Sequence, residues 1–427
     1  MNPMLQLDEK FKHDDSISNY ETYAFDPISG TQLNNPGSIT INVQNSDCFY
    51  RPSKSSIQFE GKIETTGDAY TKDTLISLTN NGIMYLFDNI KYLLSGSEVE
   101  SVFNPGHASN IIGLAKYSSS YNIGLNQCWA PDSSDEPADT NTGFKTRREY
   151  ILGGDLGTFR FAVPLEHIFG FCDDYKKVLY GFQHSLVLTR SSSDNNAFFK
   201  FVNPKLNVAV APGKVTLTAV RWMLPRCTPA DVARYELFKQ IKAEVILDVG
   251  FRMRQCISTT VPAANQFTWR MGIRSSPESP RHIFLAFQTK RDGDQEKNIA
   301  VYDHCNLQSA HILLNGDRYP INDFQLDYAK NHFDTVYGDF SSFIERFYQL
   351  DKMITCTSVD PSLYKSLFPI LYFDVSRQSE RLKSGVTDIT VHCTFKTNPD
   401  TTTCHAVMIS DRQLRFKSDG NKMVVLY

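Results

Sequence analysis

The sequence contains no apolar run approaching the roughly 18 residues that a helix needs to cross a membrane, so we predict no transmembrane segment. Its N-terminal segment Met1–Lys10 is polar and acidic, and we therefore expect no signal peptide. No Asn-x-Ser or Asn-x-Thr acceptor for N-glycosylation occurs in the chain. These absences predict a soluble protein made in a reducing compartment.

Cysteines are few and irregularly spaced. The nine cysteines form no C-x-x-C pair, and their number is odd. A small secreted protein stabilised by disulfides would carry a dense, even set. We predict that all are free thiols: Cys48, Cys128, Cys172, Cys227, Cys256, Cys305, Cys356, Cys393 and Cys404.

The short motifs that mark many enzymes are also missing. There is no G-x-S-x-G turn, no H-E-x-x-H, no P-loop and no G-x-G-x-x-G. We therefore predict no catalytic residues, no cofactor-binding residues, no metal-binding residues and no cofactor, in a protein that is not an enzyme.

The composition is balanced in charge and rich in aromatic residues. Of the 427 residues, 41% are hydrophobic and 21% are charged, with a formal net charge of -3. This length predicts two or three folding units of roughly 150–200 residues each. The near-neutral charge argues against specific nucleic-acid binding, because neutralising phosphates requires clustered Lys and Arg. We interpret the one dense basic cluster, Lys145, Arg147 and Arg148, as a solvated loop surface.

Short β-type segments separated by turn residues recur along most of the chain. The clearest alternation places Ile389, Val391, Cys393 and Phe395 on one face of a strand. Many short strands predict sandwiches or barrels, and no alternation of strands and helices suggests a doubly wound sheet. Strands are predicted at 39–43, 55–64, 158–163, 178–189, 214–224, 267–273, 282–289, 373–375, 386–397, 403–410 and 422–426.

A polar break divides this pattern into two all-β units in tandem. It runs from the Ser-rich and Asn-rich segment Arg190–Asn196 to Pro212-Gly213, and we place the boundary within 190–213. The predicted organisation is an N-terminal arm over 1–38, a first unit over 39–196 and a second over 197–427.

The first of a few short helices is predicted between strands. Thr228 followed by Pro229 indicates a helix start, with a side-chain cap and then a residue that needs no amide donor. Its apolar stripe would comprise Tyr235, Phe238 and Ile241.

A second stripe comprises Phe340, Ile344, Phe347 and Leu350, which we expect to be covered by its own sandwich rather than by a neighbour. Asp360, followed by proline, opens a third helix.

Two clusters resemble metal sites. Asp292, Asp294 and Glu296 alternate as in a calcium loop, but Lys297 stands where the EF-hand requires glycine, so we predict a polar hairpin tip. The pairs His392-Cys393 and Cys404-His405 lie on strands predicted to be neighbours. Alternation lets one His and one Cys share a face, which is fewer than the three or four ligands of zinc.

Two thiols lie near a possible base in the sequence. Cys305 follows Asp303-His304, and Cys172 lies five residues after His167. Nothing in either segment indicates the strained turn of a nucleophile, so we assign neither a catalytic role.

Three segments resemble a known family when taken in order: Phe161–Phe171; Ser275–Arg281 followed by 283–290 and 292–295; and Phe373–Arg381 followed by Met408–Arg412 and Ser418–Lys422. They resemble the major capsid proteins of Polinton (Maverick) elements and adintovirus-like small DNA viruses, copies of which are integrated in animal genomes. The resemblance extends from Thr158 to the C-terminus.

The resemblance implies a double jelly roll, with two eight-stranded jelly rolls side by side, a few inserted helices and no catalytic residues. It also implies homotrimers of pseudo-hexameric outline that tile an icosahedral shell. The expected partners are copies of this chain, a penton protein and minor capsid proteins. The expected location is the virion, assembled in the host nucleus or cytoplasm.

For such a trimer we expect subunit contacts that bury at least ~2,000 Å² per pair. We expect them to come from the long segments between strands, because sandwich strands already satisfy their own hydrogen bonds. The predicted segments are Asn104–Tyr150, Tyr302–Tyr319 and Phe340–Phe368.

Three alternative functions remain open. The first is a jelly-roll receptor- or glycan-binding protein, with a shallow pocket of aromatic and Asp/Asn side chains. The second is a β-sandwich hydrolase that uses Cys or His. The third is a host-domesticated capsid-derived protein with the same fold.

Overall fold

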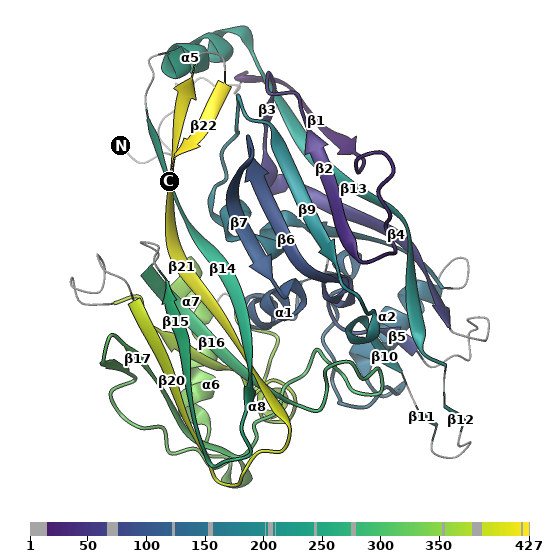
Figure 1. The fold of residues 1–427 in the computed structure, drawn as a ribbon, viewed down its shortest axis with the longest axis vertical. Helices are drawn as coiled ribbons and strands as arrows, with labels where there is room; N and C mark the ends of the chain where they lie inside the picture. The colour runs from purple at the N-terminus through teal and green to yellow at the C-terminus, as the bar shows by residue number, and fades with distance from the viewer. Residues whose placement is uncertain are drawn as a thin grey trace, which may run out of the picture.

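The computed structural model describes residues 15–65, 76–121, 124–152, 157–200, 202–203, 208–209, 211–242, 246–274, 279–351, 355–377, 387–419 and 422–426. Within them, two β-sandwiches are connected through helix α5 (Asp231–Lys242), which lies at one end of the molecule (Figure 1). No helix in this part of the chain is long and apolar enough to span a membrane.

The first sandwich has two antiparallel sheets. One contains, in spatial order, β1 (Ile17–Phe25), β13 (Gly213–Pro229), β4 (Ser56–Thr65) and β8 (Thr158–Pro164), with β3 (Phe49–Tyr50) paired to β13. The other contains β2 (Gly37–Val43), β9 (His184–Arg190), β6 (Phe87–Leu94) and β7 (Ser97–Phe103). Two small sheets pair β5 (Ile76–Leu78) with β10 (Phe198–Lys200), and β11 (Val202–Asn203) with β12 (Val208–Ala209).

The second sandwich repeats this plan. One sheet contains β14 (Leu247–Val261), β21 (Thr402–Asp419), β16 (Ser279–Thr289) and β19 (Leu371–Asp374), with β22 (Lys422–Leu426) paired to β21. The other contains β15 (Gln266–Arg274), β20 (Thr387–Phe395), β17 (Leu307–Leu314) and β18 (Asp317–Tyr319).

The strand order is the same in both sandwiches. When the eight main strands of each are numbered along the chain, the sheets have the orders 1-8-3-6 and 2-7-4-5 in both. This is the arrangement of a jelly roll, in which two Greek keys close a sandwich. The prediction of two tandem jelly rolls with short inserted helices is confirmed.

The strand pairing divides the chain at a later point than we predicted. β13 follows residue 197, yet it pairs with β1 and β4 of the first jelly roll. The first jelly roll therefore continues to Pro229, and the chain passes to the second through α5. Part of the predicted arm over 1–38 is also strand, because β1 pairs along β13, whereas residues 1–14 of that arm lie outside the described residues.

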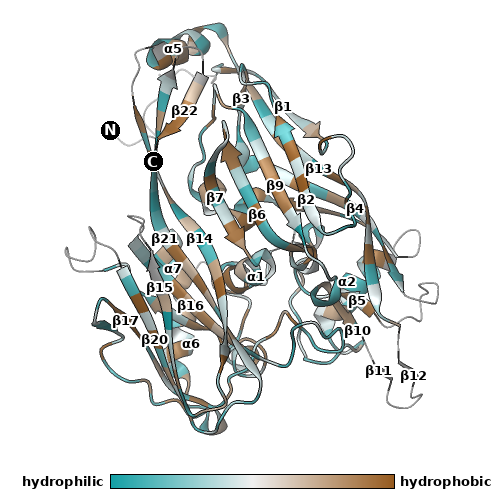
Figure 2. Ribbon diagram, viewed as in Figure 1, coloured by the Kyte–Doolittle hydropathy of each residue, from teal (hydrophilic) through white to brown (hydrophobic). Residues whose placement is uncertain are grey.

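Alternating burial explains why these segments form sandwich strands. On β20 the predicted face of Ile389, Val391, Cys393 and Phe395 is buried. Hydrophobic and hydrophilic residues alternate along several other strands as well, seen as brown and teal segments in Figure 2. On β13 the predicted alternation breaks after Leu217, where a register shift in the pairing with β4 moves the buried face.

The helices lie between strands, as predicted. In the first jelly roll they are η2 (Pro52–Lys54), η3 (Gly82–Leu86), α1 (Pro105–Lys116), η4 (Gly124–Gln127), α2 (Thr142–Leu152), α3 (Leu165–Ile168), α4 (Gly170–Asp174) and η5 (Asn195–Ala197). In the second they are η6 (Tyr328–Lys330), α6 (Asp334–Ser341), α7 (Phe343–Tyr348) and α8 (Pro361–Ser366).

The predicted stripe of the second helix is distributed over α6 and α7. Phe340, Ile344 and Phe347 are buried and covered within the chain, as expected, whereas Leu350 is exposed. Asp360 caps α8 by accepting a hydrogen bond from the Leu363 amide at 2.8 Å, which confirms that helix start.

Helix α5 begins at Asp231, later than predicted, because Thr228 is still part of β13. Its packed side also differs from the predicted stripe. Phe238 contacts the rings of Phe49 and Tyr180, whereas Tyr235 is 69% exposed.

All nine cysteines are free thiols, which confirms the prediction. Cys356 is exposed and Cys305 is partly exposed, whereas the other seven are buried. We expect a thiol reagent to label Cys356 rapidly in the native protein and all nine cysteines after denaturation, as counted by intact mass. Rapid native labelling of many thiols would contradict the buried positions.

Candidate functional site at the junction of the two jelly rolls

The acidic loop between β16 and β17 is a contact between the jelly rolls. Asp292 Oδ1 accepts a hydrogen bond from Asn196 Nδ2 at 2.7 Å, and Gln295 Oε1 accepts one from the Gly213 amide at 2.8 Å. No group of three or more His, Cys, Asp or Glu in the described part of the chain could hold a metal ion. Through the hydrogen bonds of Asp292 and Gln295, the loop connects the second jelly roll to the first.

The prediction that β20 and β21 are paired neighbours is wrong. The jelly-roll order sends these consecutive strands to opposite sheets, so His392 and His405 are on different sheets. His392 stacks on His311 with ring centroids 5.0 Å apart. Cys393 and Cys404 are both buried in the core of the second sandwich.

Neither thiol near a possible base is activated. Burial raises the pKa of Cys305 to about 11, and His304 stacks on Tyr328 with ring centroids 4.5 Å apart. Burial raises the pKa of Cys172 well above its ordinary value. Both side chains therefore remain protonated thiols at neutral pH, in which form they are poor nucleophiles.

The basic cluster is not a uniformly solvated surface, which corrects our interpretation. Arg147, on α2, is 1% exposed, and its Nη2 donates to Asp132 Oδ1 at 2.8 Å. Its Nε also donates to the Leu78 carbonyl at 2.8 Å. Lys145 pairs with Glu149 at 3.9 Å, and Arg148 pairs with Asp139 at 3.7 Å. The helix turns one of the three cations into the protein interior.

Glu100, on β7, is fully buried where the jelly rolls meet. Its Oε1 accepts hydrogen bonds from the amides of Gly170 at 3.1 Å and Arg254 at 2.8 Å. Its Oε2 accepts one from the Phe171 amide at 2.8 Å. Burial raises the pKa of Glu100 to about 7, although these donors favour the charged form. This side chain connects β7 and α4 of the first jelly roll to β14 of the second.

Asp173 is the centre of the adjoining ionic cluster. Its Oδ2 accepts hydrogen bonds from Arg254 Nη2 at 2.6 Å, Lys116 Nζ at 3.1 Å and the Tyr348 hydroxyl at 2.5 Å. Burial alone would raise the pKa of Asp173, but the two cations outweigh it and lower the pKa to about 2. Together with Glu100, the cluster balances two buried carboxylates against two cations.

Two further arginines connect the jelly rolls. Arg252 Nη2 donates to Asp174 Oδ1 at 2.6 Å. Arg291 donates through Nη1 and Nη2 to both oxygens of Asp135, at 2.8 Å and 2.9 Å. Arg291 also binds Asp303 of its own jelly roll at 2.7 Å. These bidentate contacts have a directional geometry, so they define the relative orientation of the jelly rolls as well as attracting them.

Our sequence reasoning missed this cluster. The available signal was a charged residue inside an apolar strand pattern, namely Glu100 beside Val99 and Val102, and Arg254 within Phe251–Cys256. Such residues are almost never fully buried unless they are paired. The partners are separated by 154 positions in the sequence and could be assigned only from the tertiary structure.

The close packing of α4 on β14 predicts a strong effect at Gly170. A Cβ atom there would lie 1.7 Å from the Arg252 carbonyl oxygen, so the backbones must separate. We expect Gly170→Ala to lower the free energy of unfolding by about 1–3 kcal/mol in urea titrations. Gly250→Ala on β14 is the control, because a Cβ there meets nothing within 4 Å. Equal effects of the two substitutions would contradict this account.

The matched family model covers residues 76–414 and describes a double jelly roll-like domain. The chain belongs to this family. Its strand order and its junction of two jelly rolls are those expected of a double jelly roll. No curated protein matched the sequence.

Several solved viral capsid structures share the fold of this double jelly roll protein. The Sputnik virophage structure, determined by cryo-electron microscopy, aligns with a TM-score of 0.64 at 10% identity, covering 100% of this chain and 92% of that one. The mavirus major capsid protein aligns with a TM-score of 0.56 at 12% identity, covering 98% of this chain and 92% of that one. The PBCV-1 virus capsid model aligns with a TM-score of 0.56 at 13% identity, covering 98% of this chain and 99% of that one.

Proposed function

We propose that this protein is a structural major capsid protein that forms homotrimeric, pseudo-hexameric capsomers in an icosahedral virus shell. We further propose that it belongs to the Polinton or adintovirus-like lineage, works in the virion and has no enzymatic activity. The observation that carries the proposal is the pair of jelly rolls with one strand order, held in a defined orientation by a buried ionic junction. The shared fold with viral capsid structures supports it.

A rigid double unit suits a closed shell. Three chains around a threefold axis would place six jelly rolls in one ring, so a trimer could fill a nearly hexagonal position. Neighbouring capsomers, a penton protein and minor capsid proteins would be the further partners.

Two of the segments expected to make subunit contacts are used largely within the chain. Residues Pro105–Ala115 of α1 are buried between the jelly rolls, and the apolar side chains of α6 and α7 are covered by β19 and its neighbours. Exposed large apolar residues occur on β1 and α5, and the residues that immediately precede these two elements meet where the Ala230 amide donates to the Ser16 carbonyl at 2.8 Å. They include Ile17, Tyr20, Tyr23, Val232 and Tyr235.

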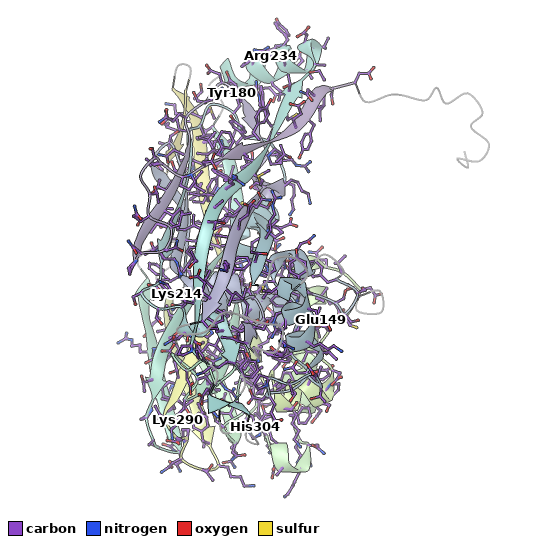
Figure 3. The ribbon with its side chains drawn as sticks, turned by 90° about the vertical axis from the view of Figure 1, so that its right-hand side faces the viewer. Glu149, Tyr180, Lys214, Arg234, Lys290 and His304 are labelled. Atoms are coloured by element: carbon purple, nitrogen blue, oxygen red, sulfur yellow. The ribbon has the colours of Figure 1, made fainter. Side chains whose placement is uncertain are left out.

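We therefore propose that this surface of β1 and α5, at the end of the molecule that carries Arg234 in Figure 3, contributes to the contacts between copies. β1 is an edge strand, and both of its faces are exposed over Ile17–Ala24. An exposed edge with apolar side chains is a surface that native proteins normally cover.

The test is the molar mass of the purified protein by size-exclusion chromatography with light scattering, diluted into the nanomolar range. A stable trimer, seen as a pseudo-hexagonal particle by negative-stain microscopy, is expected. The double variant Val232→Asp, Tyr235→Asp should weaken the trimer, whereas Ile321→Asp, at a side chain that is 85% exposed elsewhere, should not. A monomer at every concentration and salt condition would rule out the capsid proposal.

A further inference from the structure

A cavity of about 220 Å³ lies between the two jelly rolls, beside the N-terminus of α1. The first jelly roll contributes residues from η3, β6, α1 and the connection after β9, and the second contributes residues from β14, β21 and the acidic loop. Helix α1 contacts β6, β14 and β21 and lies between the two jelly rolls (Figure 1). Its N-terminus adjoins the cavity, and its last residue, Lys116, belongs to the ionic cluster at the junction. It is lined by Tyr85, Phe87, Asp88, Asn104, Gly106, His107, Ser191, Asn196, Ser258, Asp292, Thr403 and His405.

Several polar groups of this lining have no partner among the described residues. The side chains of Asp88, Asn104, Ser191 and Thr403 make no hydrogen bond to another described residue, so all four are available to a ligand. His107 is 7% exposed, and its Nδ1 is buried without a hydrogen-bond partner. An unsatisfied buried polar atom costs about 1–3 kcal/mol, so a small shift of the His107 ring that brings Nδ1 to a ligand hydroxyl would be favourable.

The start of α1 supplies donors beside these acceptors. Asn104 occupies the N-cap position with φ 45° and makes no side-chain cap, so its amide group is not used by the helix. Pro105 follows, and Gly106 and His107 are the first helix residues with N–H groups. The first N–H groups of a helix have no partner within the helix. The N–H groups of Gly106 and His107 therefore need partners from outside the helix, and both residues line the same cavity as Asp88.

The side chains that line the cavity indicate which class of ligand it would bind. No Lys or Arg lines the cavity, whereas Asp88 and Asp292 do, which disfavours an anion. A hydroxyl group donates and accepts, so it suits a wall that mixes carboxylate, amide, hydroxyl and helix N–H groups. The rings of Tyr85 and His107 meet edge to face at 5.1 Å and, with Phe87, provide an apolar side for C–H groups.

We propose that this cavity binds a sugar ring, as a free monosaccharide or as a residue of a glycan. Asp88, Thr403 and Ser191 would bind ring hydroxyls, and Asn104 and the start of α1 would donate to ring oxygens. A small shift of the His107 ring would give its Nδ1 the partner it lacks. Because residues from both jelly rolls line the cavity, a bound sugar would also bridge the junction.

The experiment measures binding by saturation-transfer NMR and isothermal titration calorimetry with glucose, galactose, mannose and N-acetylglucosamine, on the protein as purified. A glycan array separates the two sources, because glycan recognition would give array signals beyond free monosaccharide binding. We expect saturable binding of at least one sugar that persists in EDTA. The assay does not depend on trimer formation, so its outcome is independent of the capsid proposal.

Variants locate the binding. Asp88→Asn and Thr403→Val should each weaken it at least tenfold without unfolding the protein, because neither side chain makes a hydrogen bond to any residue that the structure describes. Asp47→Asn is the matched control, since Asp47 is exposed and does not line the cavity. The proposal is overturned if no sugar binds at millimolar concentration, or if neither variant changes the affinity for the sugar. Stabilisation by calcium or spermidine alone that requires Asp88 would overturn it as well, by assigning the cavity to a cation.

Discussion

Replacing Arg254 by alanine should lower the free energy of unfolding by about 3–5 kcal/mol, the cost of breaking a buried ion pair from one side. The substitution removes the guanidinium that donates to Asp173 at 2.6 Å and lies close to Glu100, while both carboxylates stay buried. Among the described residues, the remaining cations paired with Asp173 are Lys116 and the more exposed Lys176, which is 3.8 Å from Asp173 Oδ1, and neither donates to Glu100. Urea unfolding of wild type and variant, followed by tryptophan fluorescence, measures the difference.

Arg415→Ala is the matched control for this experiment. Arg415 also forms an arginine–aspartate pair across β14 and β21, with Asp248 at 3.1 Å, but both side chains are about 60% exposed. Exposed pairs contribute about 0–1 kcal/mol, so this variant should unfold close to wild type. A loss below about 1 kcal/mol for Arg254→Ala would show that the buried cluster does not hold the jelly rolls together.

Acidification from pH 7 to pH 5 should destabilise the protein strongly. Burial lowers the pKa of His167 and His184 to about 3 and the pKa of His282 and His405 to about 4. The unfolded chain then binds protons more readily than the folded one, so stability is complete above about pH 6.5 and falls below it. At pH 5 each of these histidines lowers the free energy of unfolding by about 2 kcal/mol.

Glu100 acts in the opposite direction. Its pKa is raised to about 7, so its ionisation opposes folding at high pH and its protonation recovers about 2 kcal/mol between pH 7 and pH 5. Four histidines outweigh one glutamate, and the melting temperature should therefore fall as the pH falls. Thermal unfolding at pH 7.5, 6 and 5 measures this slope. His405→Gln should make the slope shallower, and a melting temperature that is flat or rises toward pH 5 would refute the assignment.

The second jelly roll shows which features of the fold local sequence patterns predict. The face of Ile389, Val391, Cys393 and Phe395 was evident from alternation alone, because β20 is buried on one side only. The partners of that strand were not evident. The jelly-roll order pairs β20 with β15 and β17 and places the next strand in the opposite sheet, a choice made by long-range packing.

The boundary between the units illustrates the same limit. The polar break after Arg190 suggested a domain end, yet β13 returns to pair with β4 and β1 because the last strand of a jelly roll lies beside its first and third. A polar break in the sequence indicates a surface loop. The domain boundary depends on which strands pair with the final strand.

By itself the sequence determined that this protein is all-β, built in two tandem units, with unpaired cysteines and no recognisable enzyme motif. These properties follow from composition and from period-two alternation, which are local. The tertiary structure alone decided the burial of Glu100, Asp173 and Arg254, and the assembly of the cavity from both jelly rolls. Burial of a charge depends on partners far away in the chain, and no local pattern encodes which distant strand supplies them.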